Sequence, residues 1–262
     1  MSSGRRVTAG FTLDAAGDFD GDGVPNGIEG LEGLDPFVKD NDIFGSGRLF
    51  AMQQYRDFLG REGDAAGIAY WADQIVTRTQ TSGQVVSAFF SSTEFAEAVA
   101  PVVRLYFAYF LRVPDYDGLR YWVAQYKSGM TLQAISDAFA ASPESLARYG
   151  DLDNIAFVGL LYDNVLGRAP DATGLSFWTA QLATGAMTRG QLITTFSESA
   201  EYRAAIENEV FVTMIYLGML RRAPDPAGFA FWVGYMDGGN SRLALIESTL
   251  AAPEYRLRFL PP

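Results

Sequence analysis

The chain contains neither cysteine nor histidine among its 262 residues. Without cysteine it can form no disulfide and has no thiol nucleophile, and without histidine it has no imidazole base and no Cys/His zinc site. Catalysis would have to use a pair of carboxylates about 5–9.5 Å apart, as in glycoside hydrolysis. We find no pair of acids that stands out from the repeat described below. We therefore predict that the protein is not an enzyme, with a carboxylate-dependent glycan hydrolase as the catalytic alternative.

Lysine is almost absent, because Lys39 and Lys127 are the only two, and acidic residues outnumber basic ones by 31 to 20. The net charge of −11 disfavours nucleic acids and anionic membranes as partners, since both need a basic surface. No apolar run approaches the ~18–20 residues that span a bilayer, so we expect no membrane insertion. The basic start, residues 1–6, is followed by no apolar segment, so we predict no classical signal peptide. Export by another signal, a fragment of a larger protein and retention inside the cell all remain open.

Tryptophan marks an internal repeat. The four tryptophans are spaced by 51, 56 and 54 residues, and each follows a tyrosine by sixteen positions. An arginine, an aspartate and a glycine recur six, nine and twelve positions after that tyrosine, with no gap in any copy. The repeat is therefore a structural module that is present four times. The recurring residues are Tyr55, Arg61, Asp64, Gly67 and Trp71; Tyr106, Arg112, Asp115, Gly118 and Trp122; Tyr162, Arg168, Asp171, Gly174 and Trp178; and Tyr216, Arg222, Asp225, Gly228 and Trp232.

Each module is predicted to be helical, and nothing in the array alternates with the period of a strand. The recurring aspartate precedes an apolar segment and is expected to cap its helix. We expect first helices that end near Leu59, Phe110, Leu166 and Leu220, and second helices that end at Gly83, Gly129, Gly185 and Gly238. We expect third helices that open at Ser82, Thr131, Thr188 and Ser241, and linking helices capped by Ser92, Ser142, Ser199 and Ala252.

The recurring side chains have a structural and a functional interpretation. The tryptophans could stack on sugars, but a residue needed for folding must occur in every copy, so we expect each tryptophan and the aromatic before it to lie in the core. The arginine could bind a ligand together with the aspartate. We expect it instead to bind nearby carbonyls or that carboxylate. Any ligand site is then expected among residues that differ between the copies.

The first 48 residues form a separate acidic region, with nine acids against four basic residues. Within it, the segment DFDGDGVPNGIE, residues 18–29, fits the twelve-residue calcium-loop pattern. Calcium prefers six to eight oxygen ligands, and the pattern supplies carboxylates, one backbone carbonyl and a final glutamate. The sequence therefore predicts a calcium site. Its ligands are Asp18, Asp20, Asp22, the Val24 carbonyl, Asn26 and Glu29.

Two resemblances support this division. Residues 161–178, LYDNVLGRAPDATGLSFW, and the matching positions of the other copies resemble the bacterial family called domain of unknown function 4214, over about residues 49–256. The resemblance implies a secreted or surface protein, often with calcium-binding repeats alongside. Leu111 and Arg221 stand where Gly60 and Gly167 occur in the other copies. Residues 18–42 resemble a bacterial thrombospondin type-3 repeat.

In the thrombospondin type-3 family, aspartates that follow the loop help to hold a further ion. Here Asp35, Asp40 and Asp42 follow the loop, but no Asp-Gly comes after Asp42. Three arrangements stay open. The three aspartates could form a second site, Asp40 and Asp42 could complete the first, or they could be solvated.

We therefore predict an all-α fold in which a short irregular calcium-loop region, residues 1–48, precedes four helical modules stacked in a row. The modules are residues 49–101, 102–153, 154–208 and 209–262. The expected function is that of a non-catalytic, calcium-stabilised adhesion or binding protein, secreted or at the bacterial cell surface, that contacts surface or matrix polysaccharide. The alternative is a structural protein of a surface layer or filament whose partner is another copy of itself.

Overall fold

A computed structural model describes residues 14–259, and all regular secondary structure in this range is helical. The prediction of an all-α fold is confirmed. The basic start at residues 1–6 lies outside the described residues. In residues 14–46 the chain forms turns around one short helix, α1 (Asn26–Glu32), which begins inside the acidic loop. No helix precedes the loop within the described residues, of which residues 14–17 come before it.

The four modules share one order of helices: a long first helix, a second helix, a third helix and a short linking helix. In modules 3 and 4 the last turn of the first helix widens to a π-helix. Module 1 contains α2 (Gly47–Leu59), α3 (Ala65–Val76), α4 (Ser82–Phe90) and α5 (Thr93–Ala98), and module 2 contains α6 (Ala100–Phe110), α7 (Tyr116–Lys127), α8 (Leu132–Ala140) and α9 (Pro143–Tyr149). Module 3 contains α10 (Asn154–Leu161), η1 (Tyr162–Leu166), α11 (Ala172–Ala183), α12 (Arg189–Ser197) and α13 (Ala200–Ala205), and module 4 contains α14 (Glu207–Met214), η2 (Ile215–Met219), α15 (Pro226–Asp237), α16 (Leu243–Ala251) and α17 (Pro253–Arg256).

Local capping fixes where these helices begin. In every module the carboxylate of the recurring aspartate accepts a hydrogen bond from the backbone N–H of the recurring glycine three residues later. This bond satisfies one of the free N–H groups at the start of a helix. Three of the four linking helices are capped in the same way by the hydroxyls of Ser92, Ser142 and Ser199. The predicted aspartate caps and three of the four predicted caps of the linking helices are confirmed, whereas Ala252 precedes α17 but forms no side-chain cap bond.

One predicted helix end is wrong. Gly83 does not terminate the second helix of module 1, because it lies in the first turn of α4. The helix ends instead at Val76, and Arg78 takes the left-handed conformation with φ of 58°. The corresponding glycines of modules 2 and 3, Gly129 and Gly185, do have positive φ just after their helices. Module 1 therefore places an arginine where the other modules use a glycine.

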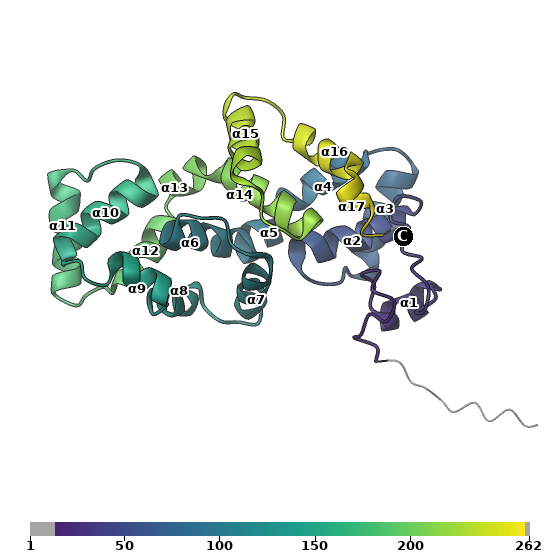
Figure 1. Cartoon of the computed structure of the whole chain (residues 1–262), viewed down its shortest axis with the longest axis horizontal. Coiled ribbons are helices and arrows are strands. Elements are labelled where there is room, and N and C mark those ends of the chain that lie inside the picture. The colour runs from purple at the N-terminus through teal and green to yellow at the C-terminus, as the bar shows by residue number, and fades with distance from the viewer. Residues whose placement is uncertain (1–13, 260–262) are drawn as a thin grey trace, which may run out of the picture.

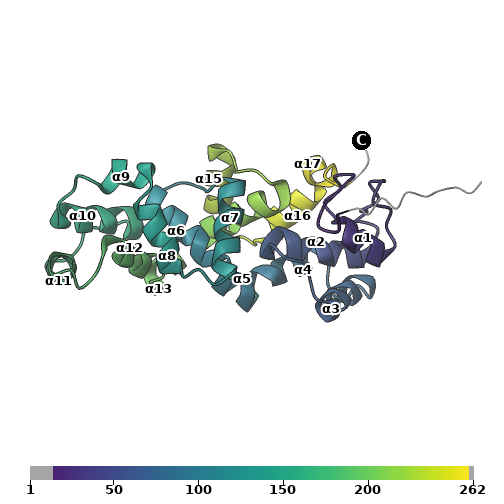
Figure 2. The same cartoon turned by 90° about the horizontal axis from the view of Figure 1, so that it is seen from below.

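The modules do not stack in a row. The third helix of module 1, α4, packs on the third helix of module 4, α16, and α8 of module 2 packs on α12 of module 3 in the same way. Figures 1 and 2 show two module pairs along the long axis, with modules 2 and 3 at one end and modules 1 and 4 at the other. Helices α5, α6 and α14 connect the pairs. The expected order is wrong because the third helices expose equivalent apolar faces that can pair in more than one order.

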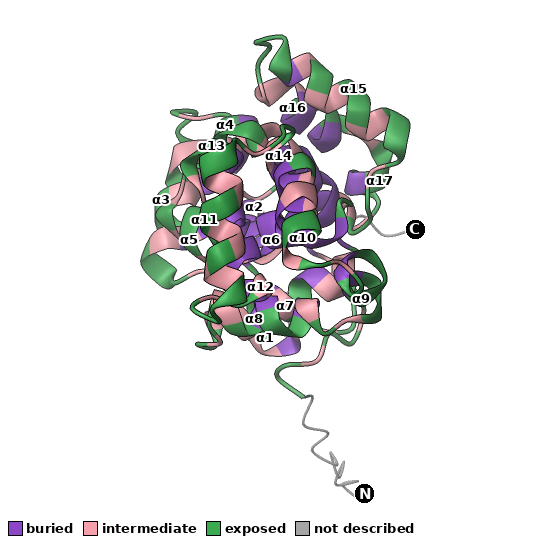
Figure 3. Ribbon diagram, turned by 90° about the vertical axis from the view of Figure 1, so that its left-hand side faces the viewer, coloured by how far each residue is buried: buried purple, intermediate pink, exposed green. Residues whose placement is uncertain are grey.

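The buried residues follow the first helices of the modules. Figure 3 shows them along α2, α6 and α14 in the middle of the molecule, whereas α11 and α15 lie outside and are largely exposed. The buried residues of these first helices are mostly apolar, with a few polar ones such as Gln53, Gln54 and Thr213. The core therefore runs through all four modules, and their first helices are its axis.

The two ends of the described chain meet on the pair of modules 1 and 4. Phe44, from the acidic region, packs edge-on against Tyr255 and Phe259, and the guanidinium of Arg256 lies 4.2 Å above the ring centre of Phe44. Asp57 of α2 forms a buried ion pair with Arg258, with 3.0 Å between the nearest atoms. The acidic region is thereby attached to the seam at which the array closes on itself.

Candidate metal centre and the recurring side chains

The acidic loop brings five carboxylates together. The side chains of Asp18, Asp20 and Asp22 converge so that one oxygen from each lies within 4.8 Å of the others. Asp22 also belongs to a second such group, with Glu29 and Asp40. Backbone N–H groups orient the aspartates, because Gly21 and Gly23 donate to Asp18 and Val24 donates to Asp22. The predicted carboxylate ligands Asp18, Asp20, Asp22 and Glu29 therefore lie in one continuous cluster.

Glu29 is the most unusual member of this cluster. Its side chain is fully buried, and neither carboxylate oxygen has a hydrogen-bond partner among the described residues. One oxygen each of Asp20 and Asp40 is also buried without a partner. An unpaired buried carboxylate is costly unless a cation or a proton compensates it. This donor set, all hard oxygens with several free lone pairs, fits a calcium ion.

The electrostatics of the cluster lead to the same conclusion. Burial, together with the charges of Asp20 and Asp22, raises the pKa of Glu29 to about 7. Burial also raises the pKa values of Asp20 and Asp22, and the neighbouring carboxylates add to the effect. These shifts belong to the protein without an ion, because carboxylates at this separation repel one another. A divalent cation would remove the repulsion.

Two predicted ligands have other contacts. The side-chain oxygen of Asn26 accepts a hydrogen bond from the Phe19 N–H at 3.0 Å, and its amide group donates to the Asp14 carbonyl at 2.7 Å. Asn26 thus ties the start of α1 to the chain before the loop. Val24 is fully buried, and its N–H binds the Asp22 carboxylate at 2.8 Å. Both residues hold the loop in shape.

The aspartates that follow the loop have different positions. Asp40 joins the cluster through Asp22 and Glu29. Asp35 and Asp42 lie outside both carboxylate groups, and each accepts backbone N–H bonds in its own turn. Of the three arrangements left open by the sequence, the geometry matches one in which Asp40 completes the first cluster.

Sequence reasoning missed Asn41. This residue is fully buried, its N–H and its side-chain amide both bind Asp22, and its side-chain oxygen has no partner among the described residues. It therefore offers a further oxygen beside the cluster. Its position directly after Asp40 in an Asp-Asn-Asp segment was the only signal in the sequence.

In the array, the recurring arginine has a partner that the sequence did not suggest. In each module its guanidinium donates two hydrogen bonds to the carboxylate of the glutamate in the linking helix. In module 2 both bonds between Arg112 and Glu144 are 2.9 Å long. The guanidinium also donates to the carbonyl of the following residue in modules 1, 2 and 4, as predicted. The other pairs are Arg61 with Glu94, Arg168 with Glu201 and Arg222 with Glu254. The arginine bond lowers the pKa of each of these glutamates, and that of Glu94 to about 2.

The recurring tyrosine explains the recurring glycine. A Cβ atom at Gly118 would lie 2.9 Å from the hydroxyl oxygen of Tyr106, and one at Gly174 would lie 2.6 Å from that of Tyr162. Modules 1 and 4 show the same crowding. These positions therefore need glycine because the hydroxyl occupies the space of a side chain. Tyrosine, glycine, arginine and aspartate together form the corner between the first and second helices.

The tryptophans are half-buried and pack on the core. In modules 1 to 3 each lies next to a phenylalanine of the third helix, with ring centres 5.3 Å apart for Trp122 and Phe139. The aromatic residue before each tryptophan is not buried, which corrects the prediction for that position. These residues are between 51% and 61% exposed and meet the tryptophan edge-on: Tyr70, Tyr121, Phe177 and Phe231. Their side chains point outward because adjacent residues on a helix lie about 100° apart.

Within residues 14–259, none of the helices combines the length and the apolar character needed to cross a membrane. The family described as "Domain of unknown function (DUF4214)" matches residues 45–99, 136–206 and 202–259, which together make up more than half of the chain. No curated protein and no solved structure matches the chain. The three matched segments contain the corners of modules 1, 3 and 4 described above. The chain belongs to the DUF4214 family.

Proposed function

We propose that the protein is a non-catalytic, calcium-stabilised binding protein, secreted or at the cell surface, whose array contacts surface or matrix polysaccharide. The observation that carries the proposal is the buried carboxylate of Glu29, which has no partner for either oxygen among the described residues. Such a group is compensated when a cation binds it together with Asp22 and Asp40. Loops of this kind in extracellular modules bind calcium in roughly the millimolar range, which the outside of a cell provides.

The position of the loop suggests what calcium does. The acidic region contacts α17 through Phe44, and the seam between modules 1 and 4 lies beside it. An ion that holds Asp22 and Glu29 together also fixes Asp40 and hence the segment that leads to Phe44. Calcium would thus stiffen the closure of the array. It has a structural role in this proposal, and the ligand is bound elsewhere.

The recurring glutamates of the array support a non-catalytic role, whereas burial raises the pKa of Glu209 on α14. A glycosidase needs a carboxylic acid with a raised pKa to protonate the leaving group. The recurring glutamates are held by arginines, and the pKa of each is lowered instead. They therefore stay ionised and occupied as parts of the module corner.

The exposed aromatics favour a glycan as the ligand. Four modules each present one aromatic side chain at the same place on the second helix, between 51% and 61% exposed. An aromatic ring packs well against the C–H faces of a sugar ring, and repeated rings suit a polymer with repeated units. The same surfaces could instead meet in contacts between copies of the chain, and solution experiments separate the two cases.

Calorimetry with calcium tests the metal centre. The wild-type chain should bind calcium, and Asp18→Ala should abolish tight binding. An unaffected isotherm would refute the assignment of the loop. Tryptophan fluorescence during titration with a panel of soluble glycans tests the ligand, because each Trp touches an exposed aromatic. A shift with a glycan, at constant calcium, supports polysaccharide binding.

Light scattering after addition of millimolar calcium tests the alternative function. Growth of large particles would support a structural subunit that assembles with itself and would count against a monomeric binder. Release of reducing ends from any glycan in the panel would support the hydrolase instead. A monomer with a glycan-dependent fluorescence change is the outcome expected here.

A further inference from the structure

The geometry points to a binding groove for a carboxylated polysaccharide between modules 1, 2 and 4, beside the acidic loop. This assignment rests on the proposed glycan-binding function and specifies its ligand class. Two adjoining hollows of about 90 and 290 Å³ form the groove and share the walls made by α2 and the start of α7. We call them together the cationic groove. Its defining residues are Arg56, Tyr116, Arg120 and Arg221.

The groove is made of residues that break the repeat. The positions that match Arg56 in the other modules hold Phe107, Asp163 and Leu217. Those that match Arg120 hold Ala69, Ser176 and Ala230, and those that match Arg221 hold Gly60, Leu111 and Gly167. Tyr116 likewise replaces Ala65, Ala172 and Pro226. Three modules thus each contribute side chains found in no other copy, and folding brings them to one place.

Charge identifies the class of ligand. The two hollows are lined by five cationic and three acidic side chains, in a chain whose net charge is −11. Three of the five cations are already paired with carboxylates, Arg56 with Glu62, and Arg61 and Lys127 both with Glu94, so the ligand would be bound by Arg120 and Arg221. Of the three acids, Asp57 is paired with Arg258, Glu62 is paired with Arg56, and Asp18 belongs to the metal centre. The guanidiniums of Arg120 and Arg221 are on exposed residues and face the groove. A carboxylate is the natural partner for such guanidiniums.

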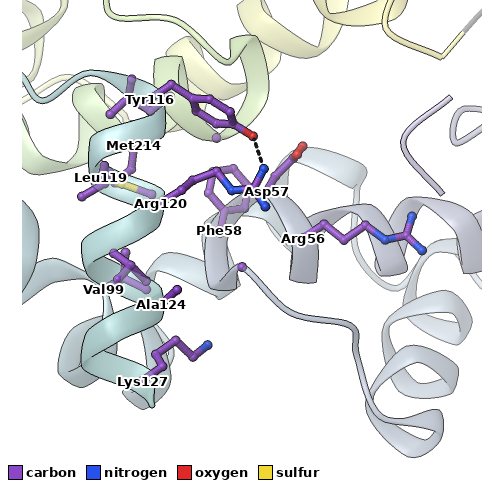
Figure 4. Close-up of a pocket in the computed structure, with 14 residues that line it drawn as sticks. Arg56, Asp57, Phe58, Val99, Tyr116, Leu119, Arg120, Ala124, Lys127 and Met214 are labelled. Atoms are coloured by element: carbon purple, nitrogen blue, oxygen red, sulfur yellow. Dashed lines mark hydrogen bonds between the residues drawn. The ribbon is translucent and has the colours of Figure 1, made fainter. Parts of the chain in front are cut away.

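Arg120 is already oriented for this role. Its guanidinium donates to the hydroxyl of Tyr116 at 3.1 Å and lies 5.4 Å from the centre of the tyrosine ring. Figure 4 shows the two side chains leaving α7 toward Asp57 and Phe58 of α2. Both residues are on α7, one helical turn apart, so their contact needs no rearrangement. An arginine held in this way loses less conformational entropy when it binds a ligand.

Arg221 takes an unfavourable backbone conformation to reach the groove. Its φ is 54°, where glycine is preferred and a longer side chain is strained. Modules 1 and 3 have glycine at the same turn, with φ of 61° and 64°. The guanidinium of Arg221 lies against Gly23 of the acidic loop, 3.6 Å from the point where a Cβ of Gly23 would be. Module 2 holds Leu111 at the same turn with φ of 52°, so the left-handed conformation is common to all four modules. What is particular to module 4 is that the residue there is a cation that faces the groove.

The smaller hollow has an apolar floor whose side chains are at most 7% exposed. Phe58, Leu119, Val123 and Leu217 line the smaller hollow between α2, α7 and η2. An acidic sugar has apolar C–H faces and a carboxylate at one edge, which match an apolar floor with arginines at its rim. A neutral sugar would leave the arginines without partners, and an acidic peptide has no comparable apolar ring face beside each carboxylate.

Calorimetry on the calcium-loaded full chain tests this assignment, with trigalacturonate as the probe and a neutral galactose trisaccharide as its match. Arg221→Gly removes the cation and restores the residue of modules 1 and 3, so the fold is retained. We expect it to weaken trigalacturonate binding about tenfold or more, because it removes a hydrogen bond between charged groups. Arg120→Ala, which restores the residue of modules 1 and 4, should have a similar effect.

Arg78→Gly is the matched control. Arg78 is exposed, has φ of 58° and lies outside the groove, so its replacement removes the same charge from the same backbone conformation. We expect it to change the affinity less than about twofold, as is usual for a distant surface charge. Equal losses in Arg78→Gly and Arg221→Gly would show only a dependence on net charge and would overturn the groove.

The remaining outcomes separate the groove from the proposed function. If trisaccharides bind but Arg221→Gly and Arg120→Ala leave the affinity unchanged, the groove is wrong and polysaccharide binding stands. The same holds if the neutral trisaccharide binds as tightly as trigalacturonate. If hexaglutamate binds as well as trigalacturonate, the carboxylated sugar is the wrong ligand class. If no glycan binds, both proposals fail.

Discussion

The acidic loop and the helical array both depend on carboxylates, but they treat them in opposite ways. In the loop, Asp20, Asp22, Glu29 and Asp40 converge, and the buried oxygens of Glu29 have no partner among the described residues. In the array, each recurring glutamate is held by two bonds from an arginine of its own module. The loop therefore holds carboxylates that an external cation would compensate, whereas the recurring glutamates have cationic partners within the array. The loop is where the protein can respond to its surroundings.

The first test concerns the most deeply buried ion pair of the array. Asp57 is 3% exposed and accepts bonds from Arg258 and from the hydroxyl of Tyr255. Asp57→Ala leaves the Arg258 charge without its partner, so we expect the free energy of unfolding to fall by about 3–5 kcal/mol. Urea unfolding measures it. Asp73→Ala, on the exposed face of α3, should change it by less than about 0.5 kcal/mol, and equal effects would contradict the prediction.

The second test replaces the carboxylate that lacks a partner. Glu29→Gln keeps the shape of the side chain and removes its charge, so we expect calcium to bind about 100-fold more weakly, because affinity depends on the number of charged ligands. Calorimetry gives the affinity. Glu32→Gln is the control, since Glu32 lies one turn away on α1 and is paired with Arg48. Calcium should still bind this variant with wild-type affinity.

Glu29→Gln and Glu32→Gln should also differ in how far calcium stabilises them against heat. At a free calcium concentration 100 times the dissociation constant, the free energy of unfolding of the wild-type chain should be about 2.7 kcal/mol higher than in chelator. Glu29→Gln should lose most of this gain, and Glu32→Gln should keep it. A chelator that leaves the wild-type melting temperature unchanged would show that the loop needs no ion.

The third test concerns the corner shared by all modules. In Gly174→Ala the new Cβ would lie 2.6 Å from the Tyr162 hydroxyl, and we expect a loss of about 1–3 kcal/mol of unfolding free energy from overpacking. Tyr162→Phe in the same chain should restore part of it. Gly159→Ala is the control, because a Cβ there meets no atom within 4 Å. Gly159→Ala should be neutral or stabilising, because alanine favours a helix more than glycine does. An equal loss in both variants would show that crowding against Tyr162 is not the cause.

The fourth test compares two arginine pairs. Glu94 binds both Arg61 and Lys127, whereas Glu201 binds Arg168 alone and is half exposed. We expect Glu94→Gln to lower the free energy of unfolding by about 1–2 kcal/mol, and Glu201→Gln to lower it by less, because solvent screens the exposed pair. The pKa of Glu94 is lowered to about 2, so its contribution is complete above its unfolded pKa near 4.5. The difference between wild type and Glu94→Gln should shrink as the pH falls from 4.5 toward 2, and a difference independent of pH would argue against the ion pair.

Local features of the chain were readable from the sequence, and distant ones were not. The aspartate caps at Asp64 and Asp115 involve a glycine only three residues away, so the pattern in the sequence specifies them. The partner of Arg61 is Glu94, in another helix, and nothing in the spacing identifies it. Module 1 meets module 4 because the apolar faces of α4 and α16 fit, which no local pattern reveals. The helices were thus predictable, but their order of packing was not.

The metal centre shows the same limit. The twelve-residue pattern placed Asp18, Asp20, Asp22 and Glu29 together because the loop is continuous. Asp40 and Asn41 enter from a later turn, and their approach depends on how the chain folds back over Asp22. Asn26 fits the pattern by identity, but its side chain is bonded to Phe19 and Asp14. A motif therefore specified most of the oxygen donors and missed those that arrive from outside it.

The pairing of modules 1 and 4 also determines the order in which the protein can be built on the ribosome. Modules 2 and 3 are neighbours in the chain, so their third helices, α8 and α12, can pair as soon as module 3 has emerged. The matching face of α4 must wait for α16, about 160 residues later in the chain. Until then the face of α4 that packs on α16 lacks its final cover, as does Phe90, whose ring meets Phe211 of module 4. We therefore expect the nascent chain to be most prone to aggregation and to chaperone binding at α4, and to lose that tendency only when module 4 is complete.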